Sequence, residues 1–214
     1  MIILKKMLKS IMAGIAISIG SVIYLSCSDK NLGALLFSVG ILMVMEFKLL
    51  LYTGYVPTQR ENHPKFYKYI LESLLIFGGN ILGGMITAGL LGLTSKGPIL
   101  YEKALAVCTT KLGENPLSFQ AFISVFILSI FCGFIIAGIV KATNLKHKVL
   151  YVMMMIGVFI LCGFEHVVAD SYYFAASLKL FTWEGLLFMA ACGLGNFTGG
   201  LLCSFIKNPE KNSN

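Results

Sequence analysis

One stretch inside a long apolar segment decides the class of fold: Gly163-Phe164-Glu165-His166-Val167-Val168-Ala169-Asp170. It places three ionisable side chains within Val149–Phe181, a segment long enough to cross a lipid bilayer. Ionisable groups at membrane depth are costly and normally face a pathway or a partner. The adjacent glycine indicates a broken helix, which is tolerated in a membrane where the freed backbone lines a cavity or packs on protein. The stretch therefore predicts a polar pore or binding site within a membrane.

The composition indicates that the whole chain is a membrane protein. Hydrophobic residues make up 57% of its 214 residues and charged residues 13%, whereas a soluble domain of this length needs far more polar surface. Six segments are apolar enough to be candidate crossings: Ser10–Leu25, Leu32–Leu51, Ile70–Leu93, Phe119–Val140, Val149–Phe181 and Glu184–Ile206. We expect a single transmembrane domain over residues 1–214, with a short N-terminus of about residues 1–9 and a polar tail of about residues 207–214.

Basic residues are distributed unevenly between the loops. With six crossings, the side that holds both termini collects Lys5, Lys6, Lys9, Arg60, Lys65, Lys68, Lys141, Lys146, Lys148, Lys207 and Lys211. The other side holds Lys30, Lys96, Lys103, Lys111 and Lys179. Lysine and arginine concentrate on the cytoplasmic face, so we expect both termini to be cytoplasmic and the protein to be integral to the cytoplasmic (inner) membrane. The net charge of +7 then matches anionic lipid headgroups and gives no reason to expect a nucleic-acid partner.

The second apolar segment resembles the fifth, because each contains charged residues and has a glycine close to them. It carries Glu46 and Lys48 near its end, followed by Gly54 and then by a polar stretch that starts at Pro57. The two charges can form a pair with each other, pair with Glu165 or His166, or snorkel to the interface. Interrupted segments in second and fifth place suggest two halves of three helices with opposite topology, and a substrate path where the broken helices meet.

The third and sixth segments share the clearest internal echo of the chain. Gly78-Gly79-Asn80-Ile81-Leu82-Gly83-Gly84 is matched by Gly193-Leu194-Gly195-Asn196-Phe197-Thr198-Gly199-Gly200. Small residues permit close contact between helices, and an asparagine amide can bind the freed backbone groups of a broken neighbour. We therefore expect the glycines to pack helices, and Asn80 and Asn196 to support the loops rather than contact substrate.

Enzymatic chemistry is not indicated. The six cysteines include no Cys-x-x-Cys pair, so neither a metal site nor a disulfide framework is expected. A paired-histidine metal motif, a serine nucleophile elbow and a cofactor loop are also missing from the sequence. Between the third and fourth segments, Tyr101–Thr110 predicts an external or interfacial amphipathic helix, after which Lys111 is expected to be a solvated charge.

The chain resembles the formate/nitrite transporter family, which includes formate, nitrite and hydrosulfide channels. The resemblance is carried by the stretch from Gly163 to Asp170, where many members have Asn in place of Asp170, by both Gly-Asn-x-x-Gly-Gly stretches, by Leu51-Tyr52-Thr53-Gly54 and by Ala13-Gly14-Ile15-Ala16-Ile17-Ser18-Ile19-Gly20. The stretch from Lys48 to Gly54 and the pair Cys132-Gly133 are closer to the hydrosulfide channels.

The resemblance implies an all-α membrane protein with six transmembrane helices in an aquaporin-like inverted repeat, whose second and fifth helices are interrupted. It also implies a homopentamer with one anion pore in each protomer. In that family Thr53 and His166 would face each other at the pore centre from the two interrupting loops. The other residues that the resemblance places on the substrate path are Leu51 and Phe159 as apolar constrictions, Tyr52 near that wall, and Lys111 as a lysine that draws anions.

These observations predict a channel for small monovalent anions of weak acids, namely hydrosulfide, formate or nitrite. His166 is expected to donate a hydrogen bond or to lend a proton, since histidine changes charge near neutral pH. Glu165 is expected to bind backbone N–H groups of the loop, and Asp170 to support it as well. The alternative is a proton-coupled secondary transporter with a relay of Glu46, Lys48, His166 and Asp170. No cofactor is expected for either function.

Overall fold

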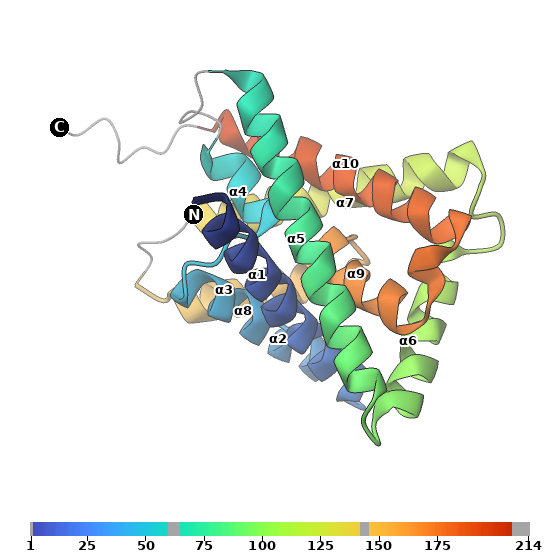
Figure 1. The fold of residues 1–214 in the computed structure, drawn as a ribbon. Helices are drawn as coiled ribbons and strands as arrows, with labels where there is room; N and C mark the ends of the chain where they lie inside the picture. Colours follow the sequence, from blue (N-terminus) through green and yellow to red (C-terminus); the bar gives the residue numbers. More distant parts are fainter. Residues whose placement is uncertain (1, 60–64, 142–145, 207–214) are drawn as a thin grey trace.

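Four long helices form the frame of the molecule. The computed structural model describes residues 2–59, 65–141 and 146–206, and these residues are helical or loop, with no strand (Figure 1). The long helices are α1 (Ile2–Ser26), α5 (Phe66–Gly92), α7 (Phe119–Lys141) and α10 (Trp183–Ser204). Within the described residues, these four are long and apolar enough to cross a membrane.

Shorter helices make up the rest of the chain. They are α2 (Lys30–Leu36), α3 (Ser38–Glu46), α4 (Tyr52–Gln59), α6 (Gly97–Leu112), α8 (Lys148–Leu161), α9 (Val167–Ala176) and the 3-10 turn η2 (Lys179–Phe181). The second apolar segment is thus divided between α2 and α3, with a non-helical stretch after α3 that leads into α4. The fifth is divided between α8 and α9, with a non-helical stretch after α8.

The long helices pack in two parallel pairs, α1 with α5 and α7 with α10 (Figure 1). Glycines allow this close approach. A Cβ added at Gly83 of α5 would meet the carbonyl oxygen of Ile11, and one added at Gly199 of α10 would meet that of Ile130. The two glycine runs of the third and sixth segments therefore lie at equivalent helix contacts.

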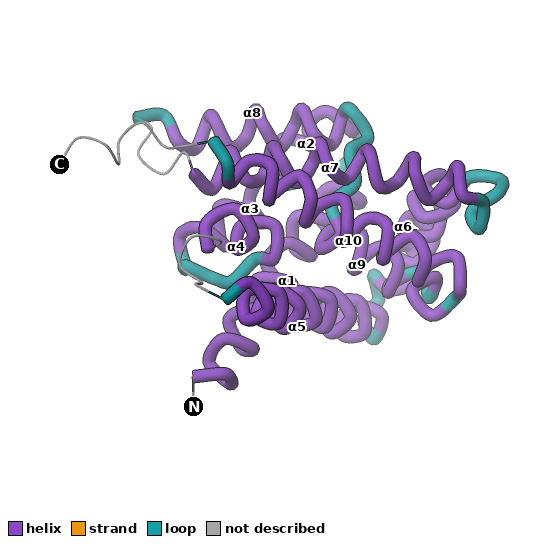
Figure 2. Tube along the Cα trace, turned by 90° about the horizontal axis from the view of Figure 1, so that it is seen from above, coloured by secondary structure: helices purple, strands orange, loops and turns teal. Residues whose placement is uncertain are grey.

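The two short helices α4 and α9 lie inside the molecule, between the long pairs (Figure 2). α9 is buried from Val167 to Ala175 and α4 from Tyr52 to Pro57. α4 packs on α7 and α10, whereas α9 packs mainly on α5, and also on α1 and α6. Each half of the chain thus supplies a short helix that packs against the long helices of the other half, and the core forms where the halves interlock.

Two helices, α1 and α6, are longer than the sequence analysis predicts. The first helix begins at Ile2 rather than near Ser10, because no residue that breaks a helix interrupts this part, and Lys6 forms an ion pair of 2.6 Å with Glu72 of α5. The helix expected at Tyr101–Thr110 extends from Gly97 to Leu112 and buries Leu100, Ala104 and Cys108 at every fourth residue. The polar tail at residues 207–214 lies outside the described residues.

Candidate pore site

The loop between α3 and α4 is held by the side chain of Asn80 on α5. The amide oxygen Oδ1 accepts a hydrogen bond of 2.8 Å from the Tyr52 backbone N–H. The amide nitrogen Nδ2 donates to two carbonyl oxygens, that of Leu50 at 2.9 Å and that of Ser10 on α1 at 2.7 Å. Asn80 is fully buried, so its bonds to Tyr52 and Leu50 replace water for backbone groups that the helix break leaves unpaired, and its bond to Ser10 ties the loop to α1.

Asn196 on α10 holds the loop between α8 and α9 in the same way. Its Oδ1 accepts a hydrogen bond of 2.9 Å from the Val167 backbone N–H. Its Nδ2 donates to the carbonyl oxygens of Glu165 and of Ser129 on α7, both at 2.8 Å. Each asparagine thus joins one long-helix pair to one loop.

A glycine makes room behind each asparagine. A Cβ at Gly14 of α1 would meet the backbone carbonyl oxygen of Asn80, and a Cβ at Gly133 of α7 would meet that of Asn196. Any larger residue at either position would move the backbone that carries the asparagine. The internal echo of the sequence therefore corresponds to a repeated hydrogen-bonding unit of glycine, asparagine and loop.

The helices before the two loops also end alike. After α8, Gly163 has a φ of 69°, and the Phe164 N–H bonds to the Phe159 carbonyl oxygen at 3.0 Å. After α3, Lys48 has a φ of 50°, and the Leu49 N–H bonds to the Val44 carbonyl oxygen at 2.9 Å. Both are helix endings in which one residue adopts the left-handed conformation that favours glycine. Lys48 occupies that position without being glycine.

The two loops bring Thr53 and His166 into contact. The Thr53 Oγ1 lies 3.0 Å from the His166 Nε2, and both residues are buried. His166 also caps α9, because its Nδ1 accepts a hydrogen bond of 3.2 Å from the Ala169 N–H. A nitrogen that accepts carries no proton, so the neutral ring holds its proton on Nε2 and donates it to Thr53. The Thr53 hydroxyl proton is then available to another acceptor.

Two cavities flank this contact. The first, here the His166 cavity, has a volume of about 620 Å³ and is lined by His166 and Phe159. The second, the Leu51 cavity, has a volume of about 260 Å³ and is lined by Leu51, which precedes α4, and by Gly54, which follows Thr53. The two cavities share no lining residue. The Thr53–His166 contact therefore joins a residue next to the wall of the Leu51 cavity to a residue that lines the His166 cavity, and the buried side chains of Leu51 and Phe159 each line one of the two cavities.

Tyr52 is turned away from the cavities. Its hydroxyl donates a hydrogen bond of 3.1 Å to the Gly193 carbonyl oxygen, and its ring packs on Phe77 with centroids 5.0 Å apart. Tyr52 lines neither the His166 cavity nor the Leu51 cavity. The structure therefore places it as a contact between α4 and the long helices.

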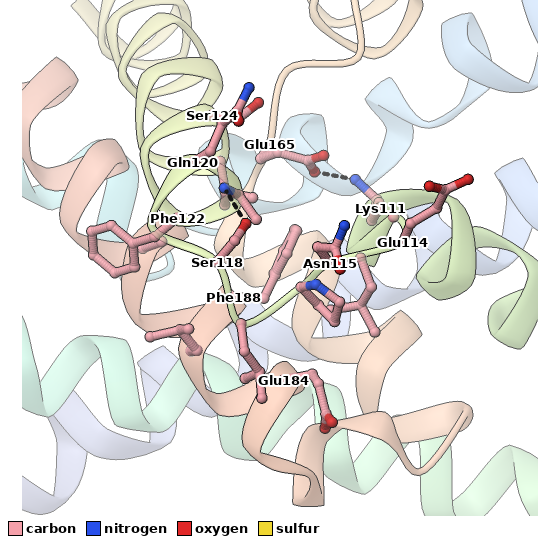
Figure 3. Close-up of a pocket in the computed structure, with 18 of the residues that line it drawn as sticks. Lys111, Glu114, Asn115, Ser118, Gln120, Phe122, Ser124, Glu165, Glu184 and Phe188 are labelled. Atoms are coloured by element: carbon pink, nitrogen blue, oxygen red, sulfur yellow. Dashed lines mark hydrogen bonds and ion pairs between the residues drawn. The ribbon is translucent and has the colours of Figure 1, made fainter.

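Lys111, expected as a solvated charge, instead forms a buried cluster with two carboxylates. Its ammonium forms an ion pair with the Glu165 carboxylate and lies 3.1 Å from the Asp170 Oδ1. The exposed fractions of the three side chains are 19% for Lys111, 7% for Glu165 and 2% for Asp170. Figure 3 shows Lys111 and Glu165 pointing toward each other in a third cavity of about 850 Å³, here the Lys111 cavity.

The Glu165 side chain therefore does not bind backbone N–H groups of the loop as expected. It reaches Lys111, and the Glu165 residue supports the loop through its backbone carbonyl, which Asn196 binds. The Cys192 thiol donates a hydrogen bond of 3.6 Å to the Oδ2 of Asp170. Burial lowers the pKa of the Lys111 ammonium. The negative charges of Asp170 and Glu165 together raise that pKa by more than burial lowers it, so the overall shift is upward.

Glu46 and Lys48 are not brought together with the central residues. Both side chains are exposed, and among the described residues no ion pair joins either of them to a partner. Lys48 lines the Leu51 cavity beside Lys148, and its backbone carbonyl accepts a hydrogen bond of 3.2 Å from the Lys9 ammonium. In the described part of the chain, no cluster of three His, Cys, Asp or Glu side chains is placed to hold a metal ion.

The family can now be assigned. A sequence model described as "Formate/nitrite transporter" matches residues 1–207. The chain belongs to the formate/nitrite transporter family. A relative described as "Uncharacterized transporter YrhG" from Bacillus subtilis (strain 168) is 30% identical over an alignment of 193 residues, which covers 83% of this chain and 65% of the relative. The chain therefore spans just under two thirds of that relative's length.

Two solved structures share the fold of this family member. One is described as "Pentameric formate channel with formate bound", with a TM-score of 0.74, 20% sequence identity and coverage of 94% of this chain and 93% of that one. The other is described as "FNT family ion channel", with a TM-score of 0.73, 21% identity and coverage of 93% and 86%. The family and these neighbours are channels and transporters, not enzymes.

Proposed function

We propose that this protein is a channel for small monovalent anions of weak acids, namely formate, nitrite or hydrosulfide, across the cytoplasmic membrane. The observation that carries the proposal is the Thr53–His166 contact between two cavities, on loops that two asparagines hold alike. The match to the formate/nitrite transporter family supports it. So does the fold shared with a channel described as having formate bound.

The proposed topology has six crossings. The four long helices supply the first, third, fourth and sixth. We assign the second to α2, α3 and α4, and the fifth to α8 and α9, each interrupted at its loop. The repeated Asn80 and Asn196 hydrogen bonds support an inverted repeat of two three-helix halves. With the positive-inside distribution of lysine, this topology places both termini in the cytoplasm.

The permeation path runs from the His166 cavity, past Phe159 and Leu51, to the Leu51 cavity. A bare anion in the membrane carries a large desolvation cost. The helices α4 and α9 both begin at the central loops, so the positive ends of their dipoles offset part of this cost. The Thr53 hydroxyl donates a hydrogen bond to the anion, while the narrow apolar rings of Leu51 and Phe159 exclude larger hydrated ions.

His166 acts in this path as a neutral hydrogen-bond donor that orients Thr53. Adding a proton to its ring would place that proton on Nδ1, which already accepts from the Ala169 N–H. The resulting positive charge would also lie at the N-terminus of α9, where the helix dipole disfavours cations. This geometry favours hydrogen bonding over proton lending for His166.

We also propose that five copies assemble into a ring with one pore in each. The structural neighbour described as a pentameric formate channel supports this. A row of exposed apolar side chains along α5, including Leu71, Leu74, Leu82 and Leu90, is available to contact lipid or a second copy. Native mass spectrometry of the detergent-solubilised protein tests it, and a stable monomer or dimer would contradict the ring.

The test of function is flux into proteoliposomes of the purified protein, with a panel of formate, nitrite, hydrosulfide and chloride. We expect flux of at least one weak-acid anion and exclusion of chloride. Empty liposomes and liposomes with the His166→Phe variant are the controls. The same flux from empty liposomes and from the wild-type protein would refute the proposal.

A proton-coupled transporter is the second candidate, favoured by one observation. Two carboxylates share a single lysine beside the path, which is a suitable site for a proton. The relay suggested by the sequence loses two members, because Glu46 and Lys48 are exposed and away from Asp170. A coupled transporter binds and releases each anion in a conformational cycle, so its flux saturates as the anion concentration rises, whereas flux through a channel continues to increase. The concentration dependence of flux into liposomes therefore distinguishes the two functions.

A further inference from the structure

The Lys111 cluster has one carboxylate more than its cation can balance. The Lys111 ammonium contacts both the Glu165 carboxylate and the Asp170 Oδ1. With all three groups ionised, the cluster carries one net negative charge. The two carboxylates are almost completely buried, so water compensates little of that charge.

No second cation faces the two carboxylates among the described residues. From α10, Cys192 contacts the Asp170 Oδ2 through its thiol at 3.6 Å. From α7 and α9, Cys132 and Tyr173 lie close enough to interact electrostatically with Asp170. His166, on the same loop as Glu165, uses both ring nitrogens elsewhere. The neighbours are therefore neutral, and the surplus carboxylate lacks a counter-charge.

A buried carboxylate without a counter-charge retains a proton, because the neutral acid costs less to bury than the ion. We propose that the Glu165–Asp170 pair holds one such proton and lends it to the permeating anion in the His166 cavity. Both carboxylates line that cavity, as do His166 and Phe159. An anion thus meets the proton before it meets the dry constriction. This inference rests on the proposed channel function.

The transfer is balanced without another reactant. The carboxyl O–H bond breaks, its electron pair stays on the carboxylate, and the anion forms a new bond to hydrogen. The neutral acid passes Phe159 and Leu51, then loses its proton to water in the Leu51 cavity. A hydronium ion from the water on the His166 side reprotonates the carboxylate. One proton therefore accompanies each anion, and transport is electroneutral.

Lys111 keeps the pair ready for this step. With one carboxyl protonated, the cluster is neutral overall and does not repel an approaching anion. With both ionised, it would repel the anion just where the path narrows. The lysine thus limits the pair to one retained proton rather than two, because its charge stabilises one carboxylate.

Two isosteric substitutions each remove the surplus carboxylate of the Lys111 cluster. Asp170→Asn and Glu165→Gln each leave Lys111 with one carboxylate and no spare proton. We expect each to lower weak-acid flux into proteoliposomes about tenfold or more, since an anion must then cross the constriction as an ion. The dependence on external pH that exceeds the acid's own ionisation should also disappear. Glu102→Gln, on an exposed part of the same helix as Lys111, is the matched control and should change neither property.

A second measurement does not depend on transport. Infrared spectroscopy of the assembled wild-type protein at neutral pH should show the carbonyl band of a buried protonated carboxyl group, and both variants should lose it. Absence of the band in the wild type, or its persistence in both variants, would overturn the inference. Higher flux through Asp170→Asn would overturn it too, because the aspartate would then be only a repulsive barrier.

Failure of the inference and failure of the proposed function are distinguishable. If wild-type flux carries one net negative charge per anion, seen as a dependence on membrane potential, the protein is a channel but the proton is not lent. If wild-type protein moves no anion of the panel, the channel proposal fails, and proton lending fails with it. Electroneutral flux that both variants lose is the expected result.

Discussion

The two interrupting loops have the same frame and different side chains. The Asn80 amide binds the carbonyl of Leu50 and the N–H of Tyr52, and the Asn196 amide binds the equivalent groups of Glu165 and Val167. Leu51 and His166 therefore occupy matching positions. The frame uses only backbone groups and the two amides, so the side chains of the loops are free to differ. One loop supplies an apolar ring and the other supplies the ionisable chemistry.

The strongest test of this comparison removes the frame from one loop at a time. Asn80→Leu and Asn196→Leu each leave two buried backbone groups of a loop, one N–H and one carbonyl oxygen, without partners. At about 1–3 kcal/mol for each unsatisfied group, we expect a loss of several kcal/mol in either variant. Thermal unfolding of the assembled protein in detergent measures it, with Asn115→Ala in an exposed loop as the control. A large loss of stability in only one of the two variants would show that the two loops are not held in the same way.

A milder test changes the glycines behind the asparagines. Gly14→Ala and Gly133→Ala would each force the new Cβ against an asparagine carbonyl oxygen, and we expect a loss of about 1–3 kcal/mol from this overpacking. Gly89→Ala in α5 is the matched control, because a Cβ there meets nothing within 4 Å. It should leave the protein unchanged or slightly more stable. Equal unfolding temperatures for all three variants would contradict the close contact.

The chemistry of the second loop is tested at His166. His166→Asn keeps a polar side chain, so folding and assembly should survive. Flux should fall about tenfold, because the variant loses the hydrogen bond between His166 and Thr53 that orients the Thr53 hydroxyl. A hydrogen bond between neutral groups contributes roughly 1 kcal/mol or more. Because we assign the lent proton to the Glu165–Asp170 pair, the pH dependence of flux between about pH 5 and 8 should remain. A flat pH profile in this variant would instead identify His166 as the proton lender.

The constrictions should respond more weakly. Leu51→Ala and Phe159→Ala widen the apolar rings on the two sides of the Thr53–His166 contact, and each should raise the flux of larger anions a few-fold relative to formate. The double variant should relax selection further. Flux of an anion series of increasing size measures this effect, and unchanged exclusion in both single variants would show that these side chains do not set the pore width.

The smallest expected effect lies at the helix endings. Lys48 adopts a left-handed conformation where its counterpart Gly163 is glycine. Lys48→Gly should therefore stabilise the protein by about 1 kcal/mol, and Gly163→Ala should destabilise it by about 1–2 kcal/mol. Opposite shifts in unfolding temperature are the expected result. A destabilising Lys48→Gly would mean that the lysine side chain contributes more than its backbone strain costs.

The frame was largely predictable from the sequence because its signals are local. The apolar segments at 70–93, 119–140 and 184–206 match α5, α7 and α10 to within a few residues. The Gly-Asn echo led to the hydrogen-bonding role of Asn80 and Asn196, because glycine and asparagine have few other reasons to recur inside apolar helices. The break after α8 was also predictable, because Gly163 lies in the turn that follows the helix.

The Lys111 cluster was not predictable in the same way. Lys111 and Glu165 are 54 residues apart, and no pattern in the sequence links a lysine at the end of one helix to a carboxylate on a distant loop. The suggested pairing of Glu46 and Lys48 is absent from the described residues for a related reason. Their closeness suggested a pair, but Lys48 serves as the residue that ends α3 through its backbone.

The position of each asparagine along the chain determines when its loop can close during synthesis. Both helix partners of the first loop, Ser10 and Asn80, lie within the first 80 residues. The second loop depends on Asn196, which a ribosome adds about 30 residues after Glu165. Until then the backbone beside His166 has no amide to bind it inside the bilayer. A chain that stalls before α10 is complete would therefore carry one finished loop and one open loop, and a membrane quality-control protease would have a defined target.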